Sequence, residues 1–159
     1  MTESKTLQIR LDPIEDKQVI ALLEAHLETM YATSPPESVF ALDLEGLRAP
    51  ELSFWSIWQG ETAVGCGALK EHSAELGEIK SMHTRADYRG NGAGGRMLEH
   101  ILNEAAARGY KDLKLETGSH PAFMPAQRLY LRHGFEYCGA FPPYQPNEFS
   151  VFMHRALSA

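Results

Sequence analysis

Hydrophobic positions along the chain follow two periods, one typical of strands and one typical of helices. Apolar residues at every second position predict strands, and apolar residues three and four positions apart predict amphipathic helices. The helical spacing is clearest after residue 93, where Met97, Leu98, Ile101, Leu102 and Ala105 would share one face. The pattern predicts strands over 7–11, 53–59, 62–70, 75–84, 111–117, 135–138 and 149–154, and helices over about 13–33, 37–47, 93–108 and 126–133.

Local signals mark the ends of these elements. Asp12 is placed to cap the first helix, with Pro13 at its first position and Glu15 as a capping-box acid. The same helix should end before Ser34, which is followed by two prolines. Gly109 stands where a left-handed residue is expected to close the third helix.

Composition narrows the class of protein. The 159 residues predict a single domain over 1–159, and 43% hydrophobic and 23% charged residues are ordinary for a globular protein. A net charge of −6 argues against binding nucleic acid or an anionic membrane surface. No signal peptide or spanning segment is visible, so a cytoplasmic location is expected.

Cysteine and histidine usage gives no sign of a disulfide framework or a metal centre. Cys66 and Cys138 are too few for a framework, and Cys66 lies in an apolar strand pattern that predicts a buried structural thiol. The 7 histidines form no metal-like cluster with acids or cysteines, so no metal is expected.

A run of glycines opens the third predicted helix. Gly90, Gly92, Gly94 and Gly95 lack the Cβ atoms that would keep a ligand away from the backbone. A helix N-terminus directs unpaired N–H groups toward one point, which suits a phosphate group. The chain has Gly-Gly-Arg where a P-loop needs Gly-Lys-Ser or Gly-Lys-Thr, so that motif is excluded.

A dinucleotide-binding fingerprint is an alternative for the same stretch. Gly90, Gly92 and Gly95 fit G-x-G-x-x-G, and Glu116 lies about 20 residues later, where a ribose-binding acid belongs. Two observations weaken this interpretation. Residues 85–89 form a connector between the predicted strand and the first glycine, and too little chain follows Glu116 for the rest of a doubly wound domain.

Three motifs in order resemble the GCN5-related N-acetyltransferases, the GNAT superfamily. Residues 89–94, Arg-Gly-Asn-Gly-Ala-Gly, match the pyrophosphate loop Arg/Gln-x-x-Gly-x-Gly/Ala of that family. Residues 77–84 are similar to its central strand, and residues 126–135 to its A-x-x-L-Y-x-x-x-G-F segment. Residues 116–119 and 141–153 also resemble a bacterial subgroup of uncharacterised acetyltransferases.

The resemblance implies a fold and an activity. The fold class is α/β (α+β): a mixed, mostly antiparallel sheet with helices on both faces, in which strands 75–84 and 111–117 splay apart to admit acetyl-CoA. The activity is direct transfer of an acetyl group from acetyl-CoA to an amine of a small molecule, without an acyl-enzyme. A catalytically silent acyl-CoA-binding module is the alternative of a different class. A homodimer is compatible with either.

The resemblance also assigns site residues. Glu78 stands where many members carry a catalytic glutamate, and Tyr130 matches a tyrosine that protonates the leaving thiolate. Glu116 is an alternative base or a solvated strand end. The predicted cofactor-binding residues are Met82, His83 and Thr84 on the central strand and Arg89, Gly90, Asn91, Gly92, Ala93, Gly94 and Gly95 in the loop. On that strand the backbone N–H groups of Met82 and Thr84 are expected to bind, and His83 itself is expected to be a partly exposed, nonspecific histidine.

Two further stretches concern the surroundings of the site. Many members have an asparagine before the last motif, but this chain has Pro-Ala-Phe-Met-Pro over 121–125, which predicts an apolar wall instead. The acceptor wall implied by the resemblance contains aromatic, acidic and hydroxyl side chains, namely Tyr31, Ser38, Asp43, Glu45 and Tyr144.

Overall fold

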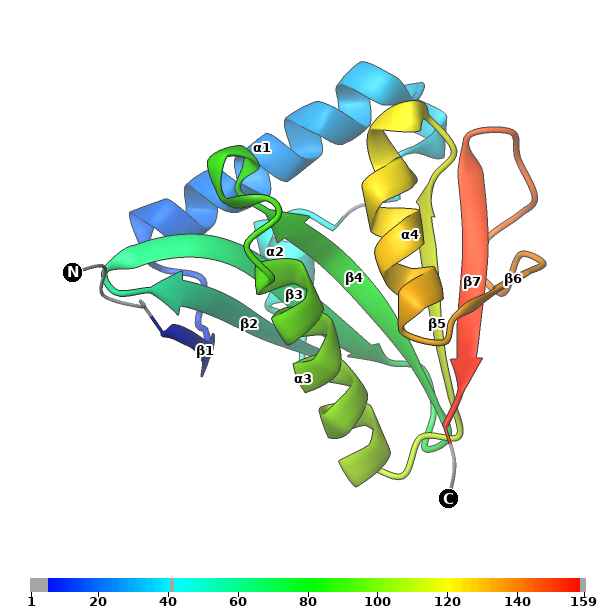
Figure 1. Ribbon diagram of the computed structural model, residues 1–159. Coiled ribbons are helices and arrows are strands. Elements are labelled where there is room, and N and C mark those ends of the chain that lie inside the picture. Colours follow the sequence, from blue (N-terminus) through cyan, green and yellow to red (C-terminus); the bar gives the residue numbers. More distant parts are fainter. Residues whose placement is uncertain (1–5, 41, 158–159) are drawn as a thin grey trace.

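The structure is a computed structural model that describes residues 6–40 and 42–157. One seven-stranded sheet runs in the order β1-β2-β3-β4-β5-β7-β6 (Figure 1). The strands are β1 (Leu7–Leu11), β2 (Leu52–Gln59), β3 (Thr62–Glu71), β4 (Leu76–Thr84), β5 (Asp112–Gly118), β6 (Glu136–Cys138) and β7 (Ser150–Ala156). The helices are α1 (Lys17–Thr33), α2 (Leu44–Leu47), α3 (Ala93–Ala107) and α4 (Met124–Arg132), with the 3-10 turns η1 (Pro36–Ser38), η2 (Ala86–Tyr88) and η3 (Pro121–Phe123).

Within the described residues the sheet is antiparallel except between β4 and β5. This agrees with the predicted mixed sheet and excludes the doubly wound parallel sheet that a dinucleotide fingerprint requires. The turn η2 also separates β4 from Gly90, as the connector at residues 85–89 indicated.

Helices cover both faces of the sheet. On one face α3 and α4 bury the larger core, which includes Ile79, Leu115 and Met153 from the central strands (Figure 1). On the other face α1 packs with Val19 and Leu22 against the first half of the sheet. Successive strand residues point to opposite faces, so Glu78 and Glu116, next to Ile79 and Leu115, face away from α3 and α4.

The first helix begins at Lys17, and the predicted start at residue 13 is wrong. Asp12 accepts a hydrogen bond from the Ile14 backbone N–H (2.7 Å) and from the Ser56 hydroxyl (2.6 Å), which fixes a local turn instead of a helix cap. Ile14 takes a φ of 60° and is 1% exposed, because this conformation turns its side chain into the core. Asp16 caps the helix through the backbone N–H of Gln18.

The predicted second helix over 37–47 is also wrong. The structure has the short turn η1, an extended Val39, and then the four-residue helix α2. Asp43 accepts a hydrogen bond from the Gly46 N–H (2.8 Å), so its side chain starts a new helix where the prediction had a continuous one. The other predicted elements agree to within one or two residues, which is the usual accuracy for element ends.

Candidate active site

A gap between two central strands organises the site. The parallel pairing of β4 and β5 covers Leu76–Ile79 and Asp112–Leu115, and beyond it the two strands diverge (Figure 1). The second half of β5 stays paired with β7. The pairing of β4 with β3 is irregular after Lys80, and Ser81 takes a φ of 54°. The splayed strand pair that the family resemblance implied is therefore present.

The glycine run lies at the start of α3. Gly90 and Gly92 have φ values of 84° and 83°, which residues with a side chain rarely adopt, and no atom lies within 4 Å of a Cβ built on either. A Cβ on Gly94 would approach Leu129 Cδ2 (3.2 Å) and Thr84 Oγ1 (3.4 Å). The N-terminus of α3 has no side-chain cap and no acid in its first turn. Its N–H groups are thus available to an anion, and phosphate binding by this loop stays a prediction.

Glu78 is the centre of a buried hydrogen-bond network. Its side chain lies on β4 and the residue is 1% exposed. One carboxylate oxygen, Oε1, lies 2.7 Å from His72 Nε2. The other, Oε2, accepts from the Tyr144 hydroxyl (2.5 Å) and lies 3.3 Å from Lys80 Nζ. Both oxygens of the predicted base are therefore engaged, and the lysine compensates its charge.

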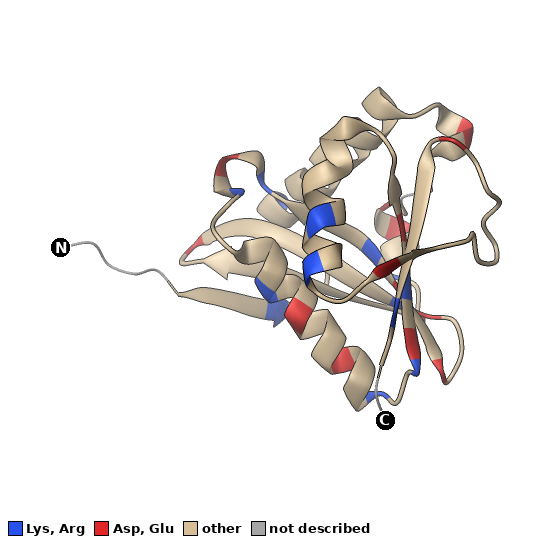
Figure 2. Cartoon of the chain, turned by 45° about the vertical axis from the view of Figure 1, so that its right-hand side comes forward, with Lys and Arg blue, Asp and Glu red and all other residues tan. Residues whose placement is uncertain are grey.

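The partners of Glu78 come from three separate segments. Lys80 shares its face of β4, His72 lies in the β3–β4 connection, and Tyr144 comes from the loop before β7. The Lys80 ammonium donates to the Tyr144 hydroxyl (2.7 Å) and is itself buried. Charged residues of both signs can be seen on the central strands (Figure 2). Lys80 and His72 were missed in the sequence, although the alternation of β4 would have placed Lys80 on the same face as Glu78.

Glu116 lies on the same face, just past the last β4–β5 pair. Its Oε2 accepts a hydrogen bond from the Ser150 hydroxyl (2.7 Å). The pKa of Glu116 is raised above its ordinary value, mainly by burial and further by the charge of Glu78. The hydrogen bond from Ser150 and the charge of Lys80 act in the opposite direction and offset this only in part. Glu116 thus lies where the two strands part, whereas Glu78 lies in the paired part of β4 and is more deeply enclosed.

Tyr130 lies on the opposite face of the sheet, in α4. It is 5% exposed and its ring packs edge-on against Phe135 at 5.7 Å. Burial, and secondarily the negative charge of Glu116, raise the pKa of Tyr130 above its ordinary value, so the phenol stays protonated at neutral pH. Tyr130 and Glu78 thus face opposite sides of the sheet.

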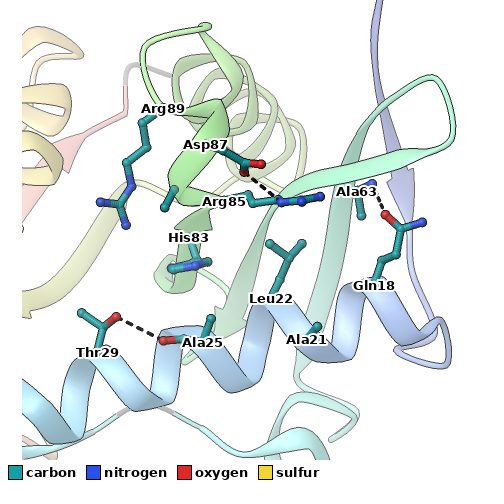
Figure 3. A pocket seen from close by; sticks show the side chains of 11 residues that line it. Gln18, Ala21, Leu22, Ala25, Thr29, Ala63, His83, Arg85, Asp87 and Arg89 are labelled. Carbon is teal, nitrogen blue, oxygen red and sulfur yellow. Dashed lines mark hydrogen bonds and ion pairs between the residues drawn. The ribbon is translucent and has the colours of Figure 1, made fainter.

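A cavity of about 590 Å³ lies between α1 and the turn before the glycine run (Figure 3). Leu22 and Ala25 of α1 line one side, and His83, Arg89 and the Arg85–Asp87 ion pair (2.8 Å) line the other. Burial and the nearby Arg89 charge lower the pKa of His83 to about 4, so its ring is neutral at pH 7. Neither Glu78 nor Tyr130 lines this cavity.

Only some of the residues predicted to surround the site lie near it. The Phe123 ring of η3 lies against the backbone of Gly118 at the end of β5, which fits the apolar wall predicted for 121–125. Tyr144 contacts Glu78, whereas Asp43 caps α2 and Tyr31 is 58% exposed. The prediction for Cys66 is confirmed, since it is 1% exposed and burial raises the pKa of its thiol to about 12.

No group of three or more His, Cys, Asp and Glu side chains in the described part of the chain could hold a metal ion. None of its helices combines the length and the apolar character needed to cross a membrane.

A mixed sheet that opens between its parallel strands, beside a glycine-lined helix N-terminus, is the architecture of an acyl-CoA-dependent acetyltransferase. Residues 19–135 match the Acetyltransferase (GNAT) family, and the chain belongs to this family. The enzyme is therefore an N-acetyltransferase, as the three sequence motifs predicted.

Relatives extend over nearly the whole chain. The uncharacterised N-acetyltransferase YsnE of Bacillus subtilis is 48% identical over 151 residues, covering 95% of this chain and 100% of the relative. The uncharacterised N-acetyltransferase YedL of Escherichia coli is 41% identical, covering 94% of each chain. The crystal structure of a putative acyl-CoA N-acyltransferase from Klebsiella pneumoniae is 31% identical, with a TM-score of 0.76 over 96% of this chain and 98% of that one.

One solved structure of the same fold contains acetyl-CoA. A GNAT acetyltransferase from Elizabethkingia anophelis, solved with acetyl-CoA bound, superposes with a TM-score of 0.66 over 98% of this chain and 100% of that one. Its sequence identity is 16%, so this likeness concerns the fold alone.

Proposed function

We propose that this enzyme transfers an acetyl group from acetyl-CoA directly to an amine of a small molecule. The observation that carries the proposal is the gap between β4 and β5, with the glycine run beside it and a buried glutamate and a buried tyrosine on its two faces. An extended acyl donor and an amine can meet in such a gap from opposite faces of the sheet.

The donor would be held mainly by backbone groups. The N–H groups of Arg89 to Gly95 would bind its pyrophosphate, supported by the free N-terminus of α3. The N–H groups of Met82 and Thr84 would bind the pantetheine arm and the acetyl carbonyl, because β4 has no β5 partner beyond Ile79. These bonds would use backbone groups only. The side chain of His83 is therefore not needed for them, and it lines the cavity next to α1.

Acyl transfer needs a base and an acid, and the proposal assigns Glu78 and Tyr130 to these roles. The amine gives a proton to the Glu78 carboxylate, its nitrogen bonds to the acetyl carbon, and the carbon–sulfur bond then breaks. The departing thiolate takes the Tyr130 hydroxyl proton. An acyl-enzyme is not part of the proposal, because burial raises the pKa of both cysteine thiols and so disfavours a thiolate nucleophile.

Two measurements test this function. Calorimetry with acetyl-CoA and with NAD should detect binding of acetyl-CoA alone. Release of CoA thiol should then be followed with primary alkyl amines, polyamines, amino acids and peptides. Binding of acetyl-CoA without turnover of any amine would support the silent acyl-CoA-binding module instead.

We also propose a cytoplasmic location. Two free cysteines are compatible with a reducing compartment such as the cytoplasm. A homodimer stays a prediction, which sedimentation of the purified protein would test.

A further inference from the structure

We propose that the cavity between α1 and the turn before the glycine run is a binding site for a small carboxylate with an apolar body. This site would take a second ligand, different from acetyl-CoA and from the amine of the proposed reaction. It lies outside the gap between β4 and β5, and neither Glu78 nor Tyr130 lines it. The site is therefore independent of the proposed function and can be tested without turnover.

The cavity is large enough and accessible enough for a small molecule. Its volume of about 590 Å³ lies within the range of about 300–1,000 Å³ that small-molecule sites usually have. Ala21 and Ala25 line the cavity and are exposed to solvent, so a ligand can enter without any movement of the fold.

One wall of the cavity is formed by a single face of α1. The helix contributes residues 18, 21, 22, 25 and 29, whose spacing places them along one side of a helix (Figure 3). Ala21, Leu22 and Ala25 make the middle of this wall apolar, and Ala63 of β3 extends it. The two alanine side chains of α1 are short, which leaves room for a ligand. Such a surface suits an aliphatic or aromatic body.

Two polar side chains of the cavity already have partners within the protein. The Gln18 amide donates from Nε2 to the Glu61 carbonyl oxygen (2.9 Å) and accepts at Oε1 from the Ala63 N–H (2.9 Å). The Thr29 hydroxyl donates to the Ala25 carbonyl oxygen (3.1 Å). These groups are therefore satisfied without a ligand.

His83 and Arg89 are the polar lining residues without such partners. Within the described residues, neither side chain takes part in a hydrogen bond or an ion pair, and Figure 3 shows the Arg89 side chain extending toward α1. Burial, and secondarily the charge of Arg89, lower the pKa of His83 to about 4, so the two groups lie close together and the ring is neutral at pH 7. A ligand in this part of the cavity would meet two unused hydrogen-bonding groups.

The charges around the cavity select an anion. Asp87 compensates Arg85 at 2.8 Å, so Arg89 carries the one uncompensated charge among the lining residues that the structure describes. A guanidinium can donate two parallel hydrogen bonds to a carboxylate, and the neutral His83 ring can donate a third through its N–H. A protonated amine would be repelled by the same arginine. The lining thus favours a carboxylate over the amine of the proposed reaction.

Calorimetry of the purified protein with three small ligands tests the site. Hexanoate combines a carboxylate with an apolar body, hexanamide has a similar size without the charge, and acetate lacks the apolar body. At neutral pH and without acetyl-CoA, we expect hexanoate to bind about tenfold more tightly than either of the other two.

Arg89→Met tests the charge. The variant keeps a side chain of similar length but cannot form the charge-assisted bonds, so its affinity for hexanoate should fall by about tenfold. Arg96→Met is the matched control, because Arg96 is exposed in the first turn of α3 and does not line the cavity. It removes the same charge from the same region and should bind hexanoate as tightly as the wild type.

Ala25→Leu tests the apolar wall. Ala25 is exposed, so the fold should tolerate leucine there, but the larger side chain would occupy part of the cavity and weaken hexanoate binding by about tenfold. Ala32→Leu is the matched control, because Ala32 is exposed on the same helix and lies outside the cavity. Both variants should keep a melting temperature near that of the wild type.

A last titration separates this cavity from the glycine run, whose helix N-terminus could also attract an anion. Hexanoate should bind equally well in the presence of saturating acetyl-CoA. Displacement by acetyl-CoA, equal binding of hexanoate and hexanamide, or an unchanged affinity in Arg89→Met would overturn the site and leave the proposed function standing. An enzyme that acetylates no amine would instead refute the proposed function, without bearing on hexanoate binding.

Discussion

The Glu78 carboxylate and the Tyr144 hydroxyl, 66 positions apart in the sequence, lie 2.5 Å apart in the interior of the protein. This contact joins the central strand β4 to the loop that precedes β7. The Tyr144 ring belongs to a buried aromatic cluster with Phe141 and Phe152. An enclosed carboxylate is stable only with such donors around it, so the loop and the proposed base depend on each other.

Replacing Glu78 by glutamine should lower kcat/KM for amines by about 10²–10⁴-fold, because the variant cannot accept a proton. The deficit should shrink at high pH, where the amine is already deprotonated. A pH–rate profile of wild type and variant measures both effects, and calorimetry should show unchanged acetyl-CoA binding. An unchanged rate and pH profile would remove Glu78 from the mechanism and favour Glu116 or a bound water chain.

Replacing Tyr130 by phenylalanine removes one hydroxyl and leaves the ring packed against Phe135. Acetyl-CoA binding should persist while kcat falls by about 10²-fold, since the hydroxyl acts on the departing thiolate in the transition state. Steady-state kinetics combined with calorimetry separates the two quantities. A variant that loses affinity for acetyl-CoA but keeps its kcat would assign Tyr130 to binding.

Gly92, before α3, and Gly109, after it, offer a matched pair of substitutions. Gly92→Ala should destabilise the fold by about 1–2 kcal/mol, because alanine is strained at its φ of 83°. The added methyl group should also weaken acetyl-CoA binding by tenfold or more, since each charge-assisted bond to the phosphates contributes about 1.5–3 kcal/mol.

Gly109→Ala is the control for that experiment. Gly109 has a φ of 85° and equally open space, but it lies at the opposite end of α3. The Gly109→Ala variant should lose about as much stability as Gly92→Ala, and it should bind acetyl-CoA as tightly as the wild type. Equal losses of affinity in the two variants would show that the effect comes from instability and not from the loop.

Glu116 should make the stability of the protein depend on pH. Burial raises the pKa of Glu116 above its ordinary value of 4.5, so between the unfolded-state and the folded-state pKa the folded protein holds a proton that the unfolded chain has released. The contribution to stability is complete below the unfolded pKa and is lost as pH rises through the folded pKa. Glu116→Gln should therefore gain in melting temperature relative to the wild type as pH rises above about 4.5. A difference that stays constant with pH would contradict this.

Contiguous signals made most of the fold predictable. The glycine run, the strand before it and the segment 126–135 each carry their pattern within ten residues, and together they indicated the family and the opening between β4 and β5. The start of α1 was predicted wrongly because the Asp12 carboxylate accepts hydrogen bonds from the Ile14 N–H and the Ser56 hydroxyl. Ser56 lies on β2, so this contact could not be seen in the local sequence. Burial of Ile14 then decided the local conformation against the capping signal.

The network around Glu78 could be predicted only in part. Lys80 follows Glu78 by two residues on a strand, so its position could have been inferred from the alternation. His72 reaches Glu78 only because of the conformation of the β3–β4 connection, and Tyr144 arrives from a proline-containing loop near the end of the chain. Neither arrangement follows from a periodic pattern, because both depend on how distant segments pack.

The pair of Lys80 and Glu78 should show strong coupling in stability. Their side chains are 8% and 2% exposed and their charged atoms lie 3.3 Å apart. Lys80→Met leaves a buried carboxylate without its cation, and Glu78→Gln leaves a buried ammonium without its anion, so each variant should lose about 3–5 kcal/mol. The double variant has no unpaired charge and should be clearly more stable than the sum of the two losses predicts.

Urea unfolding of the four proteins measures this coupling. Additive losses would mean that His72 and Tyr144 alone stabilise the Glu78 charge, and that Lys80 is needed only where it contacts the Tyr144 hydroxyl.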